Sequence, residues 1–230
     1  MKILYRDNDY IAVYKETGQF VHPSNEDATI KSCLMKDLRD HIEQYVYPIH
    51  RLDRPVSGIV LFGLNPGAVK NIQKIWHSEK VRKFYLALSR GKFNKDGVFN
   101  SSLFDRNKLK KEALTRFNPL NLYQSATLVE VEILTGRYHQ IRRHFAKNVD
   151  HLLGDRTYGK KKYNDYYKEH FKLERIFLHA HRIEFVQPQT LKSVKIHCPL
   201  APDLMQCLEL LSKEHLETIR TSEYITTHYG

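Results

Sequence analysis

Cysteine and long apolar runs are both scarce in this chain of 230 residues. The three cysteines, Cys33, Cys198 and Cys207, lie far apart and form no Cys-x-x-Cys pair, so neither a disulfide framework nor a zinc knuckle is encoded. The longest nearly apolar run, residues 58–64, falls far short of the roughly 20 residues that a membrane helix needs. The N-terminus becomes polar too early for a signal peptide. We therefore expect a cytoplasmic protein with no membrane partner and no bound metal.

The signatures of several enzyme classes are also missing. The sequence holds no Gly-x-x-x-x-Gly-Lys-Ser/Thr phosphate loop, no Gly-x-Gly-x-x-Gly motif and no Gly-x-Ser-x-Gly turn. It has 13 histidines but no His-Glu-x-x-His motif. His179 and His181 would lie on one face of a strand, where a hydrogen-bonded structural pair is the favoured interpretation and a metal pair is the alternative.

What is present is an ordinary globular composition with an uneven distribution of charge. Hydrophobic residues make up 41% of the chain and charged residues 27%, which supports a packed core and excludes disorder as the main state. The net charge of +11 is concentrated in residues 70–116, with 13 basic and 4 acidic side chains, and residues 137–182, with 12 and 5. Both blocks carry aromatic residues as well. Cations neutralise phosphates and rings stack on bases, so the mixture favours RNA binding, and a solvated basic surface is the alternative.

The hydrophobic pattern predicts strands and helices in mixed order. Strands are expected at residues 3–5, 10–14, 59–64, 85–88, 126–134, 176–185 and 194–196. Helices are expected at residues 27–44, 68–79, 140–147 and 204–216. This mixture of hairpins and helices predicts an α+β fold, in which a mixed, mostly antiparallel sheet is flanked by helices.

No repeat and no low-complexity linker divides the chain. We expect a single domain over residues 1–217, followed by a polar and mobile C-terminal tail over residues 218–230. Residues 159–175 form an insertion rich in lysine and tyrosine. Its segment 160–163 is a candidate for an additional RNA contact, and a solvated loop is an equal alternative.

Residues 48–58 form a polar segment that leads into a predicted buried strand. Asp53 lies there between Arg51 and Arg54, on a loop braced by a proline and a glycine. Nearby cations stabilise the anion, so Asp53 should stay ionised and can serve as a nucleophile or a base. On the residues alone, an ion pair at the surface is the favoured interpretation and catalysis is the alternative.

A second polar segment, residues 134–144, begins where another predicted strand ends. After Gly136 it carries Arg137, Arg142 and Arg143 together with two histidines. The planar guanidinium group matches a carboxylate or a phosphate, so these side chains can hold an active-site acid or an RNA backbone. The start of a basic helix at the surface is the alternative.

Together these two segments resemble the RluA-type family of RNA pseudouridine synthases. The family's His-Arg-Leu-Asp-x-x-Thr-Ser-Gly signature matches residues 50–58 except at Val56, and its Gly-Arg-x-His-Gln-Ile-Arg signature matches residues 136–142 completely. Residues 83–91 are similar to the family's Lys-x-Tyr-x-Ala…Gly segment. Further similar segments follow in the expected order, at residues 18–23, 154–159, 178–180 and 199–203.

The resemblance covers about residues 1–210 and has two departures. Glu16 stands where proline is usual, and Asp150-His151 replaces the usual His-Pro. We expect no S4-type RNA-binding module ahead of the catalytic domain. Within the family, the most similar branch is that of tRNA pseudouridine synthase C, on residues 50–55, 63–64 and 142–144.

The resemblance implies a pseudouridine synthase catalytic fold with a central basic cleft. The implied reaction detaches uracil from ribose at N1, rotates it and rejoins it through C5, and this isomerisation requires no redox cofactor, metal or ATP. The implied substrate is a specific uridine in structured RNA, with tRNA favoured and ribosomal RNA as the rival. A catalytically silent RNA-binding protein is a further alternative. We expect a monomer that does not bind DNA.

The resemblance also implies roles for individual residues. Asp53 would be the essential carboxylate, acting on the ribose or on the base, and Arg142 would pair with it to keep it ionised and aimed. Tyr85 would stack on the target base. The expected substrate-binding residues are His50, Arg51, Arg54, Lys83, Arg137, His139, Gln140 and Arg143.

Overall fold

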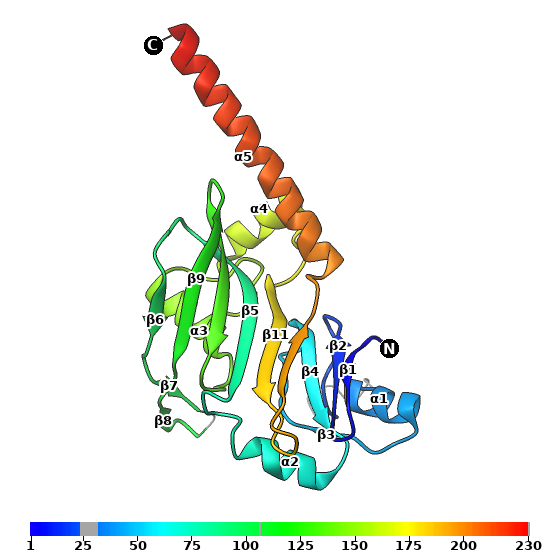
Figure 1. The fold of residues 1–230 in the computed structure, drawn as a ribbon. Coiled ribbons are helices and arrows are strands. Elements are labelled where there is room, and N and C mark those ends of the chain that lie inside the picture. The colour runs from blue at the N-terminus through cyan, green and yellow to red at the C-terminus, as the bar shows by residue number, and fades with distance from the viewer. Residues whose placement is uncertain (24–31, 106, 230) are drawn as a thin grey trace.

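A single large sheet runs through the centre of the protein (Figure 1). The computed structural model describes residues 1–23, 32–105 and 107–229, and in the last helix it describes side chains only as far as Leu216. Within this part, ten strands join in one sheet, while β7 (Leu103–Phe104) and β8 (Lys110–Lys111) form a separate hairpin.

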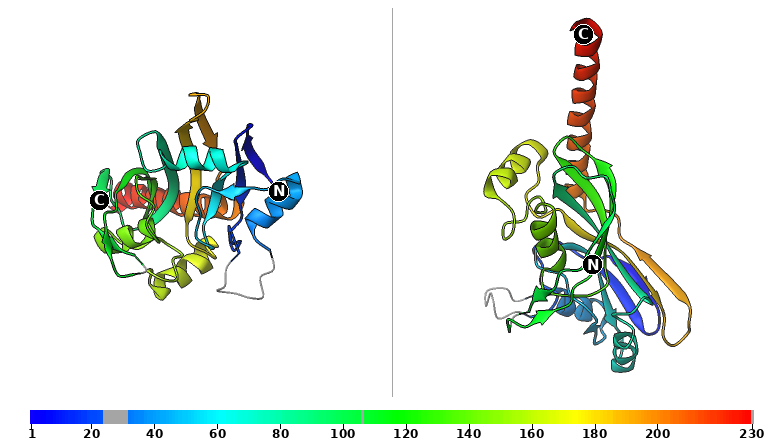
Figure 2. Two further views of the ribbon diagram at one scale, coloured as in Figure 1. Left: turned by 90° about the horizontal axis from the view of Figure 1, so that it is seen from below. Right: turned by 90° about the vertical axis from the view of Figure 1, so that its left-hand side faces the viewer.

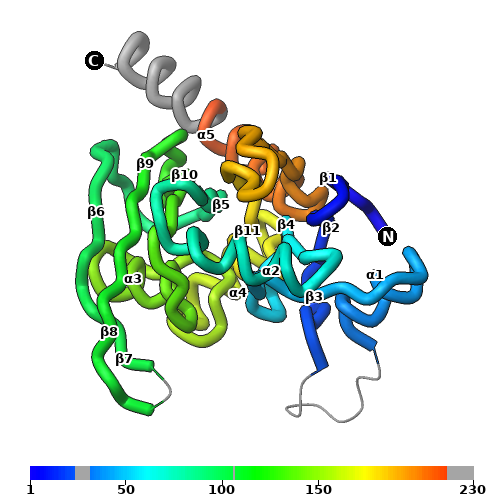
Figure 3. Tube along the Cα trace, turned by 60° about the horizontal axis from the view of Figure 1, so that its bottom comes forward, coloured from blue at the N-terminus to red at the C-terminus, as the bar shows by residue number. Residues whose placement is uncertain are grey.

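The order of the strands in the sheet differs from their order in the sequence. From one edge to the other it runs β1 (Ile3–Arg6), β2 (Tyr10–Lys15), β4 (Ser57–Gly63), β11 (Leu178–Val186), β5 (Val81–Arg90), β10 (Ala126–Ile133), β9 (Thr115–Leu122) and β6 (Gly97–Phe99). The remaining two strands are β3 (Tyr47–Pro48), which pairs with β4, and β12 (Ser193–His197), which pairs with β11. Figure 3 shows the edge strands β1 and β6 on opposite sides of the molecule.

Parallel pairing occurs once among the described strands, between β4 and β11. The other described strand pairs are antiparallel. The predicted α+β fold with a mixed, mostly antiparallel sheet is therefore confirmed.

Different helices cover the two faces of the sheet. One face packs against α1 (Leu34–Ile42) and α3 (Gln140–Asn148), and the other against α2 (Pro66–Gln73). Alternate side chains of β4 enter these two cores. Because both faces of β4 are covered, its sequence is a continuous apolar run rather than an alternation of apolar and polar residues.

A third core lies where α4 (Lys161–Phe171) packs beside the start of α5 (Pro202–Tyr229) (Figure 1). The helix α4 lies within the insertion over residues 159–175, where no helix was predicted. Tyr163, Tyr167 and Phe171 recur at four-residue spacing, which is the pattern of an amphipathic helix. Tyr167 and Phe171 are buried against α5, and Figure 2 (right) shows α4 on the same side of the sheet as α3.

Most predicted elements are present with altered bounds. The helix predicted over 140–147 is confirmed as α3. The helix predicted over 27–44 is present as α1, and the part of that prediction before residue 32 lies outside the described residues. The helix predicted over 68–79 begins earlier, because the Asn65 side chain accepts a hydrogen bond from the backbone N–H of Ala68 (2.8 Å) and caps the first turn.

Two regions differ more strongly from the prediction. No strand was predicted at β9, which contains Asn118 and Pro119, two residue types that are rare inside strands. β9 nevertheless pairs with β10, with a register irregularity beside Pro119. The helix predicted over 204–216 is the first part of the longer α5. The side chains of the tail predicted over 218–230 lie outside the described part. The mobility of this tail and the domain boundary at residue 217 therefore stay predictions.

Candidate active site

Asp53 lies on a loop that enters β4, where that strand meets β11. Gly58 of β4 has φ +121° and approaches Ala180 of β11 so closely that a Cβ atom would lie 2.2 Å from its carbonyl oxygen. Only glycine permits this conformation and this approach. The close contact between β4 and β11 therefore fixes one end of the Asp53 loop.

Lys15, the last residue of β2, secures the same loop from another side. Its side chain is fully buried, and its ammonium group donates hydrogen bonds to three backbone carbonyls, including those of Arg54 (3.1 Å) and Val56 (2.7 Å). Burial, followed by the charge of Arg175, lowers the pKa of Lys15 to about 7 against the opposing charge of Asp53. The backbone that carries Asp53 is thus held by an interior lysine, which the sequence analysis did not identify.

Arg142, in the first turn of α3, joins two carboxylates. Its Nη1 donates to Asp53 Oδ2 at 3.2 Å, while Nε and Nη2 each donate to Asp155 at 2.8 Å. The predicted contact with Asp53 is therefore present as one hydrogen bond. The two-pronged pairing that the guanidinium group allows is made with Asp155, for which the sequence analysis proposed no role.

Asp155 is buried and its carboxylate is fully engaged. Besides Arg142, the backbone N–H groups of Thr157 (2.8 Å) and Tyr158 (3.1 Å) donate to its Oδ1. Burial by itself would raise the pKa of Asp155, but Arg142 and these two amides lower it below its ordinary value. The signal for this residue was the similarity of residues 154–159 to the family.

His139 lies beside Asp53 at the start of α3, with left-handed backbone angles of φ 52° and ψ 32°. Its Nε2 is 3.4 Å from Asp53 Oδ2, its Nδ1 is 3.1 Å from the Tyr158 hydroxyl, and its ring stacks on Tyr138 with centroids 3.7 Å apart. Burial lowers the pKa of His139, and the charge of Arg142 adds to this effect against the charge of Asp53. A neutral imidazole therefore flanks the carboxylate at pH 7.

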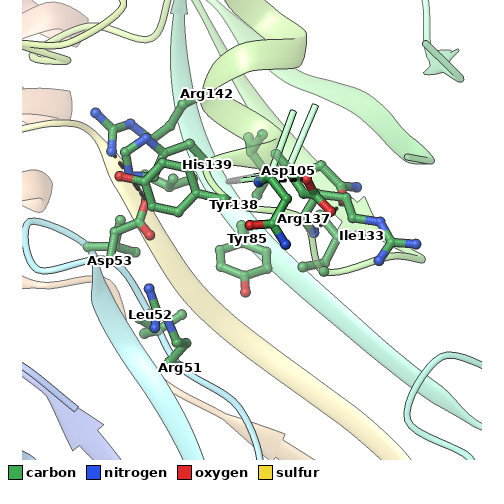
Figure 4. Close-up of a pocket in the computed structure, with 16 residues that line it drawn as sticks. Arg51, Leu52, Asp53, Tyr85, Asp105, Ile133, Arg137, Tyr138, His139 and Arg142 are labelled. Carbon is green, nitrogen blue, oxygen red and sulfur yellow. Dashed lines mark hydrogen bonds and ion pairs between the residues drawn. The ribbon is translucent and has the colours of Figure 1, made fainter. Parts of the chain in front are cut away.

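A cavity of about 520 Å³ opens beside Asp53 (Figure 4). Its apolar lining residues include Leu52, Val56, Tyr85, Ile133, Ile141 and Leu178. Tyr85 presents its ring from the middle of β5, and burial, followed by the charge of Asp53, raises its pKa. The site thus places the partly exposed Asp53 carboxylate beside apolar side chains and a protonated phenol.

A second hollow, of about 570 Å³, adjoins this cavity and shares Asp53 and Arg142 with it. Arg51 and Arg54 line it and are exposed. The Arg51 Nη1 lies 3.4 Å from His22 Nε2, while the Arg54 Nε donates to a backbone carbonyl at 3.1 Å. Two of the predicted substrate-binding arginines therefore lie at the rim of the site.

His50 and Lys83 are placed differently. His50 Nε2 accepts a hydrogen bond from the backbone N–H of Leu61 (3.0 Å), and its ring packs on Trp76 at 5.1 Å. Lys83 is buried and its Nζ donates to the Trp76 carbonyl (2.8 Å). Neither residue lines the two cavities. The geometry gives both a role in packing, and their predicted contact with substrate is untested.

Of the remaining predicted substrate-binding residues, two line the cavity and one does not. Arg137 and Gln140 line it, and Gln140 Oε1 accepts from the Arg137 backbone N–H at 3.0 Å. Arg143 does not line it, and instead donates to the backbone carbonyl of Phe104 at 2.9 Å. This bond ties the β7–β8 hairpin to α3, and two hairpin residues, Asp105 and Asn107, line the cavity.

The two histidines of β11 have separate partners. His179 Nδ1 lies 2.8 Å from Ser57 Oγ, and His181 Nε2 lies 2.9 Å from a carboxylate oxygen of Glu130. Within the described residues, no group of three or more His, Cys, Asp or Glu side chains is arranged to hold a metal. In the same part of the chain, no helix is both long and apolar enough to cross a membrane.

Comparison with known proteins gives consistent matches. The RNA pseudouridylate synthase family matches residues 9–147. The tRNA pseudouridine synthase C of Vibrio vulnificus is 32% identical, over 91% of this chain and 94% of its own. The tRNA pseudouridine synthase C of Salmonella typhimurium is 33% identical, over 99% of each chain. The solved structure of human RNA pseudouridylate synthase domain containing 4 shares the fold, with a TM-score of 0.74 at 21% identity over 92% of this chain and 93% of that one.

These matches establish the family of the chain. The family match spans more than half of the chain, and both relatives are covered over nearly their whole length. The resemblance drawn from the sequence and the predicted enzyme class are thereby confirmed. This chain belongs to the RNA pseudouridylate synthase family, whose members are isomerases that convert uridine in RNA to pseudouridine.

Proposed function

We propose that this enzyme modifies one specific uridine of a tRNA, with Asp53 as its catalytic carboxylate. The supporting observation is the placement of Asp53, which lies at the edge of the apolar cavity and contacts both Arg142 and His139. The choice of tRNA follows from the relatives, which are named tRNA pseudouridine synthase C. Asp53 keeps acceptor capacity for a substrate, because Arg142 uses only one of its oxygens.

The isomerisation makes limited demands on the protein. The bond between N1 and the ribose C1′ breaks, a bond between C5 and C1′ forms, C5 loses a proton and N1 gains one. Asp53 acts on the ribose or on the base, while Arg142 and His139 hold its carboxylate in place. The Tyr85 ring offers a surface on which the detached uracil stacks and turns. The balanced reaction needs no oxidant, metal or nucleotide.

The target uridine must leave its stack before it can enter the cavity. Extrusion of a nucleotide costs a few kcal/mol. Arg51 and Arg54 at the rim are placed to offset this cost by contacts with flanking phosphates. The basic blocks over residues 70–116 and 137–182 supply further cations for the RNA backbone.

The substitution Asp53→Asn tests the catalytic role. We expect tritium release from C5-labelled uridine in tRNA to be abolished, while RNA affinity falls less than about tenfold (~1.4 kcal/mol). Asp165→Asn, which changes an exposed aspartate of α4 that does not line the cavity, is the matched control and should release tritium normally. Undiminished release by Asp53→Asn would refute the assignment.

Mapping of pseudouridine across total RNA, from cells with and without the protein, tests the substrate. One additional site in a tRNA is the expected result. A site confined to ribosomal RNA would overturn the choice of tRNA, and RNA binding without any new site would indicate a silent RNA-binding protein. The monomeric state and cytoplasmic location stay predictions, and sedimentation of the free protein tests the first.

A further inference from the structure

The loop that carries Asp155 is held by a side chain from α4. Asn164 uses both ends of its amide group there, because its Oδ1 accepts from the Gly154 backbone N–H and its Nδ2 donates to the Asp155 carbonyl, each at 2.9 Å. The same carbonyl accepts from the Gly159 N–H at 3.0 Å. Asn164 therefore acts on the backbone on both sides of the peptide bond that precedes Asp155.

The loop has little freedom to compensate for the loss of these bonds. Gly154 has φ +78°, and a Cβ atom there would lie 2.0 Å from the Arg175 carbonyl oxygen, so the turn is packed tightly against its neighbour. Gly159 is similarly close, since a Cβ atom would lie 2.3 Å from the Asp155 carbonyl. In such a turn, the backbone position of Asp155 depends on a few direct hydrogen bonds.

The helix that supplies Asn164 is itself firmly anchored. Tyr167 and Phe171 are buried in the third core, and the Tyr167 hydroxyl lies 2.7 Å from Ser125 Oγ. At the start of the helix, the Tyr163 hydroxyl accepts from Arg90 Nη2 at 2.9 Å, and the Arg90 guanidinium lies over the Tyr163 ring at 3.8 Å. A rigid element thus transmits its position to the loop.

From the loop, the contacts continue to the reacting centre. Asp155 receives two hydrogen bonds from Arg142, and Arg142 gives its remaining bond to Asp53. The orientation of the guanidinium is set by Asp155, because two of the three bonds go there. A shift of about 1 Å in a positioning group can cost about 10²-fold in rate.

We infer that Asn164 is a positioning residue for the isomerisation, which acts through Asp155 and Arg142 on Asp53. This inference rests on the proposed role of Asp53. It gives the insertion over residues 159–175 a function in the assembly of the active site. It also predicts that an element without any residue in the cavity lining controls the rate of the chemical step.

The test compares Asn164→Ala with Ser125→Ala in single-turnover assays on tRNA. Ser125→Ala loosens α4 at Tyr167 but leaves the Asp155 loop untouched, so it controls for general weakening of the helix. We expect Asn164→Ala to lower the rate of pseudouridine formation by about tenfold to 10²-fold with RNA affinity changed less than twofold. Ser125→Ala should keep the wild-type rate.

The Nε–H signal of Arg142 in nitrogen-15 NMR spectra supplies a readout that a purely structural role would not move. This proton is bonded to Asp155, so it should exchange faster with water in Asn164→Ala and stay protected in Ser125→Ala. If Asn164→Ala does not fold, Asn164→Asp retains the acceptor for Gly154 but faces the Asp155 carbonyl with an oxygen that cannot donate, and it should show the same changes.

Three results would overturn the inference. They are an unchanged rate for Asn164→Ala, an unchanged Arg142 signal despite a lower rate, or equal losses in Ser125→Ala. Each of them leaves the role of Asp53 intact as long as Asp53→Asn is inactive. Activity of Asp53→Asn would instead refute the proposed function itself, so the two failures are distinguishable.

Discussion

Two aspartates share Arg142, and their surroundings are opposite. The Asp155 side chain is 0% exposed and accepts two bonds from Arg142 and two from backbone amides. The Asp53 side chain is 22% exposed and accepts one bond from the same guanidinium. One carboxylate is saturated with partners, and the other faces a cavity with acceptor capacity to spare.

This difference shows how one arginine can serve structure and chemistry together. A saturated, buried ion pair fixes the direction of the guanidinium group, since the planar fork matches one carboxylate at a time. An Nη1–H of the guanidinium then points to Asp53 without surrounding it. A carboxylate that reacts must remain accessible, whereas a carboxylate that positions must not move.

The largest expected effect comes from removal of the buried partner. Asp155→Ala should lower the free energy of unfolding by about 3–5 kcal/mol, because it leaves the buried Arg142 without its main counter-charge. Asp53→Asn should change it by less than about 1 kcal/mol. Urea denaturation of both variants measures the difference, and equal losses would break the comparison.

Arg142→Lys should have the next largest effect. Lysine keeps the charge but cannot hold Asp155 with two bonds and Asp53 with a third, so the aim of Asp53 is lost. We expect the rate of pseudouridine formation to fall by about 10²-fold with little change in RNA affinity. A variant with the wild-type rate would show that only the charge of Arg142 matters.

The response to acid should isolate the contribution of Asp155 to stability. The pKa of Asp155 is lowered from its ordinary value of 3.8, so its contribution to stability is present above that pH and is lost as the pH falls through the lower folded-state value. Asp155→Asn should therefore show a weaker loss of stability with acid than the wild type. Urea titrations between pH 5 and pH 3 measure these slopes, and parallel curves would contradict the expectation.

Chelation should have the smallest effect. If neither Asp53 nor Asp155 acts through a metal ion, EDTA should leave the rate of pseudouridine formation unchanged. A rate that falls with EDTA and returns with added Mg²⁺ would mean that the carboxylates also bind a metal ion. The comparison of Asp53 with Asp155 would then have to include that ion as well as Arg142.

The proximity of Asp53 and Arg142 could be predicted because two local motifs resemble one family. Their contact at 3.2 Å agrees with that expectation. The partner that takes the fork of Arg142 could not be predicted, since choosing between two acidic residues needs their burial and distance. His50 and Lys83 show the same limit. Both belong to motifs that resemble the family, yet His50 accepts from the backbone N–H of Leu61 and Lys83 donates to the backbone carbonyl of Trp76.

The sequence by itself determined the α+β class, the strands with clear apolar runs, and the segments that carry Asp53, Tyr85 and Arg142. These features are local, since periodicity and motifs lie within a few neighbouring residues. Only the tertiary structure decided that Lys15 holds the Asp53 loop, that α4 holds the Asp155 loop through Asn164, and that β9 pairs despite Pro119. Such contacts join residues far apart in the chain, and hydrogen bonds between distant segments follow from packing rather than from local pattern.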